Sequence, residues 1–152
     1  VMLIDVEAGD DSFEKASVLL NQKSLDFLRD NPIFKSLELA KIAKLKSFCK
    51  IDHLKQNQIF LESNEEIHGL YIVLTGRLQA NYETYCPGDF FGIEALTANA
   101  YSTDTKVADE GTTMLYLPAK QFKIFARRHS SSAYQIMKNI LEIRLDQQSE
   151  KE

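Results

Sequence analysis

The chain has 152 residues, of which 44% are hydrophobic and 26% are charged, and its formal net charge is −4 at pH 7. This composition is typical of a single soluble globular domain, and the excess of acidic residues argues against a direct nucleic-acid-binding surface. No apolar run is long enough to cross a bilayer or to form the core of a signal peptide, so we expect a cytoplasmic protein without membrane insertion.

The first third of the chain is predicted to be helical. Apolar residues recur at helical spacing between residues 12 and 48. Pro32 is expected to divide this stretch into two helices joined by a short turn, because proline cannot continue a helix. Residues 7–12 are acidic and polar, and Asp11 or Ser12 is placed to cap the first helix. We therefore expect an N-terminal helical region over residues 1–48.

The next part of the chain, residues 49–118, has a different pattern, in which short β-type runs alternate with turn residues. The runs predicted to form strands are 49–54, 58–61, 69–74, 77–82, 101–108 and 112–117. Strands this short and this regularly spaced are typical of a small antiparallel barrel or sandwich. A short helix over residues 91–98 is expected to interrupt them.

The last part of the chain is predicted to form two more helices. Pro118 ends the final strand and opens a helix from Ala119 to about Arg128. A second, amphipathic helix follows residues 129–132. The predicted fold class is therefore α+β and mainly β, with a small antiparallel β-barrel or jelly roll flanked by N-terminal helices and by two C-terminal helices (119–152), all within one domain over residues 1–152.

The segment most suggestive of a ligand site is residues 87–96, Pro-Gly-Asp-Phe-Phe-Gly-Ile-Glu-Ala-Leu. Glycines at positions 88 and 92 allow backbone conformations that other residues resist, and the start of a helix presents unpaired N–H groups that suit an anion. We call this segment the cassette. Its pattern predicts a turn that leads into a short helix and could hold a phosphate.

The remaining reactive residue types do not suggest catalysis or metal binding. Cys49 and Cys86 match no zinc or redox spacing and are expected to be reduced. The three histidines, at positions 53, 68 and 129, form no metal-binding pair and suggest no hydrolase triad. We therefore expect a non-catalytic protein with no metal and no resident cofactor.

At this point the order of elements resembles the cyclic-nucleotide-binding domain over roughly residues 24–146, and most closely the domains of cyclic-nucleotide-dependent protein kinases. Residues 25–37 and 40–45 are similar to the first helices of those domains. Residues 59–62 and 70–78 look like the second to fourth strands of the family, and residues 87–92 match the start of its phosphate-binding cassette.

The resemblance also implies which residues would meet a ligand. In the family, a glutamate directly after the last cassette glycine holds the ribose, and an arginine in a P-R-x-A-T-V pattern pairs with the cyclic phosphate. The candidate ligand-binding residues carried over by the resemblance are Gly92, Ile93, Glu94, Ala95, Leu96, Ser102, Thr103 and Thr105.

Two of these positions depart from the family pattern. Ile93 follows the glycine and the acid comes one place later, so Glu94 either points elsewhere or is restored to the ribose position by a one-residue insertion. Thr103 stands where the arginine belongs. Lys106 is the nearest cation, but strand alternation is expected to turn it to the face opposite Thr103, which would make it a poor substitute. Losing both charged contacts would weaken cyclic-nucleotide binding by roughly 10²–10⁴-fold.

A third departure is Ser63, which replaces a turn glycine of the family, although Asn64 can supply the turn conformation. Several apolar residues near the cassette have core packing as their expected role. They are Phe90, Phe91, Leu96, Tyr101 and Val107. The apolar residues of the last helix could either form a lid over a ligand or pack against the barrel or a partner, and packing is the safer expectation.

The resemblance implies a regulatory or sensor domain of a larger signalling protein, such as a kinase regulatory region, with weak or lost binding of cyclic AMP or cyclic GMP. Its expected partner is a neighbouring domain or subunit rather than nucleic acid. Two alternatives remain open. One is a protein-interaction module that needs no ligand and has a filled pocket, with Tyr101 turned inward. The other is the sensor domain of a bacterial catabolite-activator-type transcription regulator, in which F-G-x-E-A-L cassettes like residues 91–96 occur.

Overall fold

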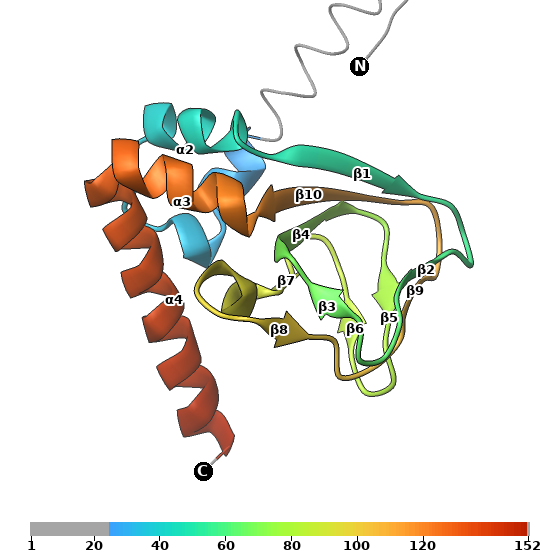
Figure 1. Cartoon of the computed structure of the whole chain (residues 1–152). Coiled ribbons are helices and arrows are strands. Elements are labelled where there is room, and N and C mark those ends of the chain that lie inside the picture. The colour runs from blue at the N-terminus through green and yellow to red at the C-terminus, as the bar shows by residue number, and fades with distance from the viewer. Residues whose placement is uncertain (1–24, 152) are drawn as a thin grey trace, which may run out of the picture.

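The structure, a computed structural model, describes residues 25–151, and its strands and helices gather at opposite ends of the molecule (Figure 1). Residues 25–29 are helical, and a short 3-10 helix, η1 (Pro32–Phe34), follows. The predicted break at Pro32 is therefore confirmed. Asn31 caps η1, because its Oδ1 accepts a hydrogen bond from the backbone N–H of Ile33 at 3.0 Å. The predicted helical spacing before residue 25 and the acidic stretch over residues 7–12 lie outside the described residues.

Helix α2 (Leu39–Lys46) leads into the strands, all of which pair in antiparallel fashion. They form two four-stranded sheets, in the orders β1-β10-β4-β7 and β2-β9-β5-β6, and one pair, β3-β8. The strands are β1 (Lys50–Leu54), β2 (Ile59–Leu61), β3 (Glu66–Ile67), β4 (Gly69–Thr75), β5 (Leu78–Gln79), β6 (Thr84–Tyr85), β7 (Phe90–Phe91), β8 (Ala100–Tyr101), β9 (Lys106–Ala108) and β10 (Thr112–Pro118). The predicted fold class, an antiparallel barrel with flanking helices, is confirmed.

Three predicted elements differ from the observed ones. The strand predicted over residues 101–108 is two strands, β8 and β9, separated by a bend. The strand predicted over 77–82 is only the two residues of β5, and the two-residue strands β3, β6 and β7 were not predicted. The helix predicted over 91–98 is the shorter 3-10 helix η2 (Ile93–Leu96). These pieces are too short for a period of two or of 3.6 residues to be recognisable in sequence.

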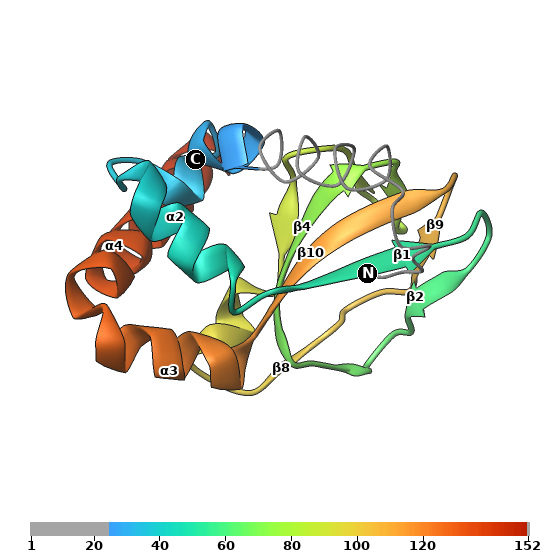
Figure 2. The ribbon, with the colours of Figure 1, turned by 90° about the horizontal axis from the view of Figure 1, so that it is seen from above.

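The chain ends in two helices, α3 (Ala119–Arg128) and α4 (Ser130–Lys151), as predicted. One cluster of buried apolar side chains joins these helices to α2 and the near face of the β1-β10-β4-β7 sheet, and a second cluster fills the barrel. Figure 2 shows the helices grouped beside one end of the barrel. No helix within the described residues combines the length and apolar character needed to cross a membrane.

Candidate functional site

The cassette turn has the backbone that its glycines predict. Gly88 and Gly92 have positive φ angles of 95° and 90°, in the left-handed region. Gly88 also donates its N–H to the carbonyl of Val73 at 2.8 Å, which fixes the turn against β4. A Cβ atom on Gly92 would lie 2.2 Å from the carbonyl oxygen of Gly69, so only glycine fits there. The turn is therefore set both by φ and by close backbone contact.

The residues after Gly92 divide into a buried set and one exposed acid. Ile93, Ala95 and Leu96 are buried and belong to the two apolar clusters. The side chain of Glu94 is 58% exposed, and its carboxylate forms an ion pair with the guanidinium of Arg144 on α4. Three of the candidate residues therefore pack in the core, while Glu94 contacts α4 and not the barrel interior.

The segment between β8 and β9 makes a bend held by the turn that contains Ser63. The Ser63 hydroxyl donates to the carbonyl of Thr103 at 3.3 Å, and its backbone N–H donates to Oγ1 of Thr105 at 3.3 Å. Asn64 has a φ of 72°, so it supplies the left-handed conformation, as expected. Its N–H donates to the carbonyl of Ser102 at 2.7 Å. This bend places Ser102 inside and leaves Thr103 exposed.

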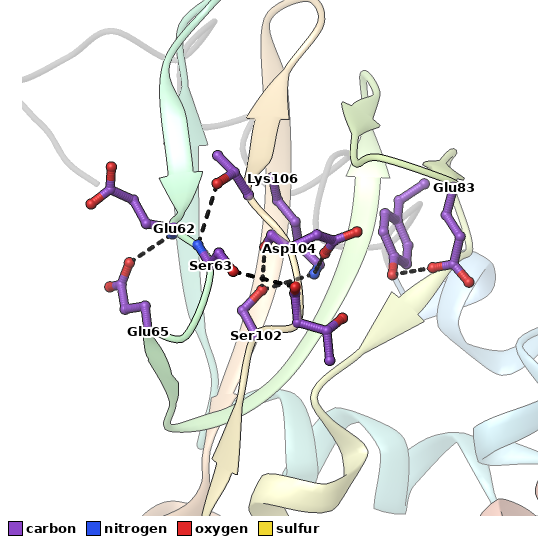
Figure 3. A network of polar contacts seen from close by, with 10 residues as sticks. Glu62, Ser63, Glu65, Glu83, Ser102, Asp104 and Lys106 are labelled. Carbon is purple, nitrogen blue, oxygen red and sulfur yellow. Dashed lines mark hydrogen bonds and ion pairs between the residues drawn. The ribbon is translucent and has the colours of Figure 1, made fainter.

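The barrel contains a buried cation, Lys106, that is already paired (Figure 3). The Lys106 side chain is only 5% exposed, and its Nζ lies 2.8 Å from Oδ1 of Asp104. The same nitrogen donates to the Ser102 hydroxyl at 3.1 Å, and that hydroxyl donates to the backbone carbonyl of Asp104 at 2.6 Å. We call Ser102, Asp104 and Lys106 the internal ion-pair cluster.

Two aromatic rings complete the surroundings of the Lys106 ammonium. Its Nζ is 5.3 Å from the ring centroid of Phe91 and 5.7 Å from that of Tyr85, within the range of a cation–π contact. The Tyr85 hydroxyl donates to the carboxylate of Glu83 at 2.5 Å. Burial, followed by the bond to Glu83, raises the pKa of Tyr85, so this side chain remains a neutral phenol at physiological pH.

These positions agree with the prediction that Thr103 and Lys106 face opposite sides, and they show which of the two faces inward. Thr103 and Lys106 do lie on opposite sides, but Thr103 faces solvent and Lys106 points into the barrel. The sequence could not show which of the two faces the interior, because residues 102–105 form a bend rather than a strand. The prediction for Tyr101 is corrected: it is 57% exposed, so it neither packs in the core nor fills the pocket.

An open cavity of about 580 Å³ lies between the cassette and α4. Its lining includes the aromatic residues Tyr85, Phe90 and Phe91, and Arg144 and Gln147 of α4. Three acidic residues also line it, namely Glu83, Asp89 and Glu94. Apart from Arg144, which is paired with Glu94, no cationic side chain lines this cavity among the described residues. The cavity is therefore lined by both aromatic and acidic side chains.

Two buried asparagines connect the cassette to the helices. Asn31 Nδ2 donates to the carbonyl of Gly88 at 2.9 Å, which ties the cap of η1 to the cassette turn. On α4, Asn139 Nδ2 donates to the carbonyls of Ile33 and Lys35, each at 2.8 Å. The 3-10 helix η1 is thus bonded to the cassette on one side and to α4 on the other. Sequence reasoning missed this connection, because an isolated asparagine carries no signal of its distant partner.

The apolar residues of α4, for which either a lid or a packing role was considered, include both buried and exposed side chains. Ile136 and Ile140 are buried, whereas Tyr134 is 70% exposed and Leu141 is 59% exposed. The buried pair faces the body of the domain, in accordance with the packing expectation. The exposed pair does not cover the cassette cavity, since neither residue lines it.

The ion pair between Glu94 and Arg144 is exposed, so we expect Glu94→Gln to change the free energy of unfolding by less than about 1 kcal/mol. Its expected effect is local: amide hydrogen exchange should become faster around Arg144, because among the described residues the partner of that side chain is Glu94. Hydrogen exchange measured by mass spectrometry tests this, with Glu142→Gln as the control on the same helix. Equal exchange rates around Arg144 in the two variants would contradict the expectation.

The described residues contain no group of three or more potential metal-ligating side chains. Cys49 and Cys86 are both free thiols. Burial raises the pKa of the Cys49 thiol to about 12, so it stays protonated and behaves as a small apolar side chain. Cys86 is exposed beside the cassette turn.

Comparison with known proteins places this arrangement in a family. The family model for the cyclic nucleotide-binding domain matches residues 51–129, which include the barrel, the cassette and α3. Among curated proteins no sequence matches the chain.

Solved structures share the fold at low sequence identity. The N-terminal domain of a transcriptional regulator from Streptomyces coelicolor A3(2) is similar with a TM-score of 0.74 and 18% identity, over 82% of this chain and 94% of that one. Thermus thermophilus Catabolite Activator Protein is similar with a TM-score of 0.69 and 19% identity, over 80% of this chain and 61% of that one. The cAMP-bound PfPKA-R fragment is similar with a TM-score of 0.61 and 22% identity, over 79% of this chain and 47% of that one. Since the family model covers more than half of the residues, the chain belongs to the cyclic nucleotide-binding domain family.

Proposed function

We propose that this domain is a non-catalytic regulatory module of a larger signalling protein and that it has lost tight binding of cyclic AMP and cyclic GMP. The observation that carries the proposal is the internal ion-pair cluster. Lys106 is the cation inside the barrel near the cassette, and it is already neutralised by Asp104 at 2.8 Å. A cyclic phosphate would have to displace this carboxylate, and it would then leave Asp104 without its partner at a position only 16% exposed.

The other candidate contacts also favour loss of nucleotide binding. Thr103, in the place of the family arginine, is exposed and carries no charge. Glu94 is engaged by Arg144. The cavity beside the cassette has three acidic residues against one arginine, a charge balance that repels a phosphate. A free phosphate-binding fork of the kind that arginine provides is therefore absent from this part of the described structure.

Isothermal titration calorimetry with cyclic AMP and cyclic GMP tests the proposal. We expect a dissociation constant weaker than about 10 μM for both nucleotides. A tighter constant for either one would contradict the proposed loss of binding.

The variant Asp104→Asn makes the test sharper, because it leaves the Lys106 ammonium without its carboxylate. We expect it to bind cyclic AMP at least about tenfold more tightly than the unaltered chain, since a charge-assisted hydrogen bond becomes available. The matched control is Asp109→Asn, which removes a carboxylate that pairs with Arg77 on the barrel surface. A circular dichroism spectrum matching that of the unaltered chain would verify that each variant is folded.

The parent protein is proposed to be a kinase regulatory region or a similar signalling protein. Support comes from the pattern of residues 25–45 and from the fold shared with PfPKA-R. The alternative, a sensor domain of a transcription regulator, is supported by the fold shared with the Streptomyces and Thermus proteins. The sequence of the full parent gene distinguishes them, because a helix-turn-helix region after this domain favours the alternative and a kinase, channel or second barrel excludes it.

A further inference from the structure

Helices α2 and α3 have an unusual charge composition for a chain with an acidic excess. Their sequences, LAKIAKLK and AKQFKIFARR, hold seven of the 18 basic residues of the chain and none of its 22 acidic residues. The favourable position of cations in the last turn of a helix accounts for some of these residues. It does not account for Lys41, in the first turn of α2, or for Lys120, in the first turn of α3, where a cation opposes the helix dipole.

Part of this charge converges at the junction of α2 with α3. The Nζ of Lys41 on α2 lies 3.2 Å from Nδ1 of His129, the residue that follows α3. Arg128 directly precedes His129 in the chain, and Lys44 lies one turn along α2 from Lys41. Burial, and then the positive charges of Lys41, Lys44 and Arg128, lowers the pKa of His129. The ring of Phe48, which follows α2 in the chain, packs edge-on against that of Phe125 of α3, with ring centroids 5.8 Å apart. We call Lys41, Lys44, Arg128 and His129 the junction surface.

Within the described residues, none of the three cations forms an ion pair. Lys44 and Arg128 are exposed, and Lys41 is half-buried. The nearest acid along the chain is Glu38, the residue before α2, and its side chain makes no cap bond and no ion pair. Like charges held together without a counter-charge repel one another, and an acidic partner would relieve that repulsion.

We propose that the junction surface is a docking site for an acidic segment of a partner protein. A membrane surface fits less well, because the apolar residues of α2 and α3, such as Ile42 and Phe122, are buried and cannot enter a lipid interface. The large exposed apolar side chains of the described structure all lie outside these two helices. A nucleic acid fits less well too, because the chain as a whole carries a charge of −4 and would repel a polyanion that extends beyond a patch of three cations.

Fluorescence anisotropy with a labelled peptide of glutamate and aspartate residues tests the proposal on the full 152-residue chain. We expect saturable binding at low ionic strength that weakens steeply when salt is raised, because the contacts are exposed charge pairs. The variant K41Q/K44Q/R128Q is expected to bind at least about tenfold more weakly. The matched control is K50Q/K55Q/K138Q, which removes three charges from exposed lysines elsewhere on the molecule. Thermal unfolding verifies that both variants are folded.

Absence of peptide binding at low salt would overturn the proposal. Equal weakening of peptide binding in the two triple variants would also overturn it, because it would indicate non-specific attraction of the peptide to the positive charges of the chain. Two further probes test the other two classes of partner, a membrane surface and a nucleic acid. The probes are vesicles that contain anionic phosphatidylserine and a short DNA duplex. The proposal is overturned if the chain binds either probe more tightly than the peptide and the variant K41Q/K44Q/R128Q no longer binds that probe. The result is independent of nucleotide binding, since none of these residues lines the cavity beside the cassette.

Discussion

Asp104→Asn is expected to lower the free energy of unfolding by about 2–4 kcal/mol, because it leaves a nearly buried ammonium without a counter-charge. Lys106 is 5% exposed, and after the substitution its Nζ has only neutral neighbours, namely the side-chain amide at position 104, the Ser102 hydroxyl and the faces of two aromatic rings. Urea denaturation followed by circular dichroism measures the change. The substitution of its partner, Lys106→Met, is expected to cost less, because Asp104 is 16% exposed against 5% for Lys106 and is therefore less desolvated.

The double variant, Asp104→Asn with Lys106→Met, is the control that separates the interaction energy of the two charges from their interactions with other residues. Removing both charges also removes the cost of an unpaired ion, so the double variant should be more stable than Asp104→Asn alone by at least about 1 kcal/mol. Additive effects of the two substitutions would contradict a direct ion pair inside the barrel. The same variants enter the calorimetric titration, so the stability and the ligand-binding roles of the pair can be compared in one series.

Asn139→Ala is expected to lower the free energy of unfolding by about 2–3 kcal/mol, because it leaves two backbone carbonyls without their donor. Asn139 is 2% exposed, and its Nδ2 bonds to the carbonyls of Ile33 and Lys35. Hydrogen exchange should also become faster in α4, since the substitution removes the polar contact between this helix and η1. Urea denaturation and hydrogen exchange by mass spectrometry give the two measurements.

Gln135→Ala provides the matched control for the asparagine. Gln135 is on the same helix and donates to Oδ1 of Asn139 at 2.9 Å, but it is only half-buried and its hydrogen bond stays within α4. We expect its loss to cost less than about 1 kcal/mol. If the two variants were equally destabilised, the bonds from α4 to η1 would not be what holds this helix in place.

Much of the fold follows from local sequence. The break at Pro32, the helix that begins after Pro118 and the long strands β1, β4 and β10 were predictable because each depends on its own residues and their periodicity. The shortest elements were not predictable in this way. Strands of two residues, such as β6 and β7, exist because a neighbouring strand supplies their hydrogen bonds, and that partner is not visible in a local window.

The candidate site was less predictable than the fold. Glycine at positions 88 and 92 indicated the cassette turn, because positive φ is a property of the residue itself. Lys106 and Thr103 were predicted on opposite faces, as observed, but which of them points inward depends on a bend held by Ser63 and Asn64, some forty residues earlier in the chain. The partners of Asn31 and Asn139 were equally invisible, since their carbonyl acceptors approach only after the helices pack.

The sequence by itself therefore determined the order of the elements, the antiparallel barrel with its flanking helices and the family resemblance, because hydrophobic period, proline, glycine and turn residues act over a few positions. Only the tertiary structure decided what the barrel contains. It turned Lys106 inward against Asp104, brought Arg144 of α4 to Glu94 and brought Lys41 of α2 to His129. The physical reason is that charge pairing and burial depend on distances across the chain, which packing sets and local propensity does not.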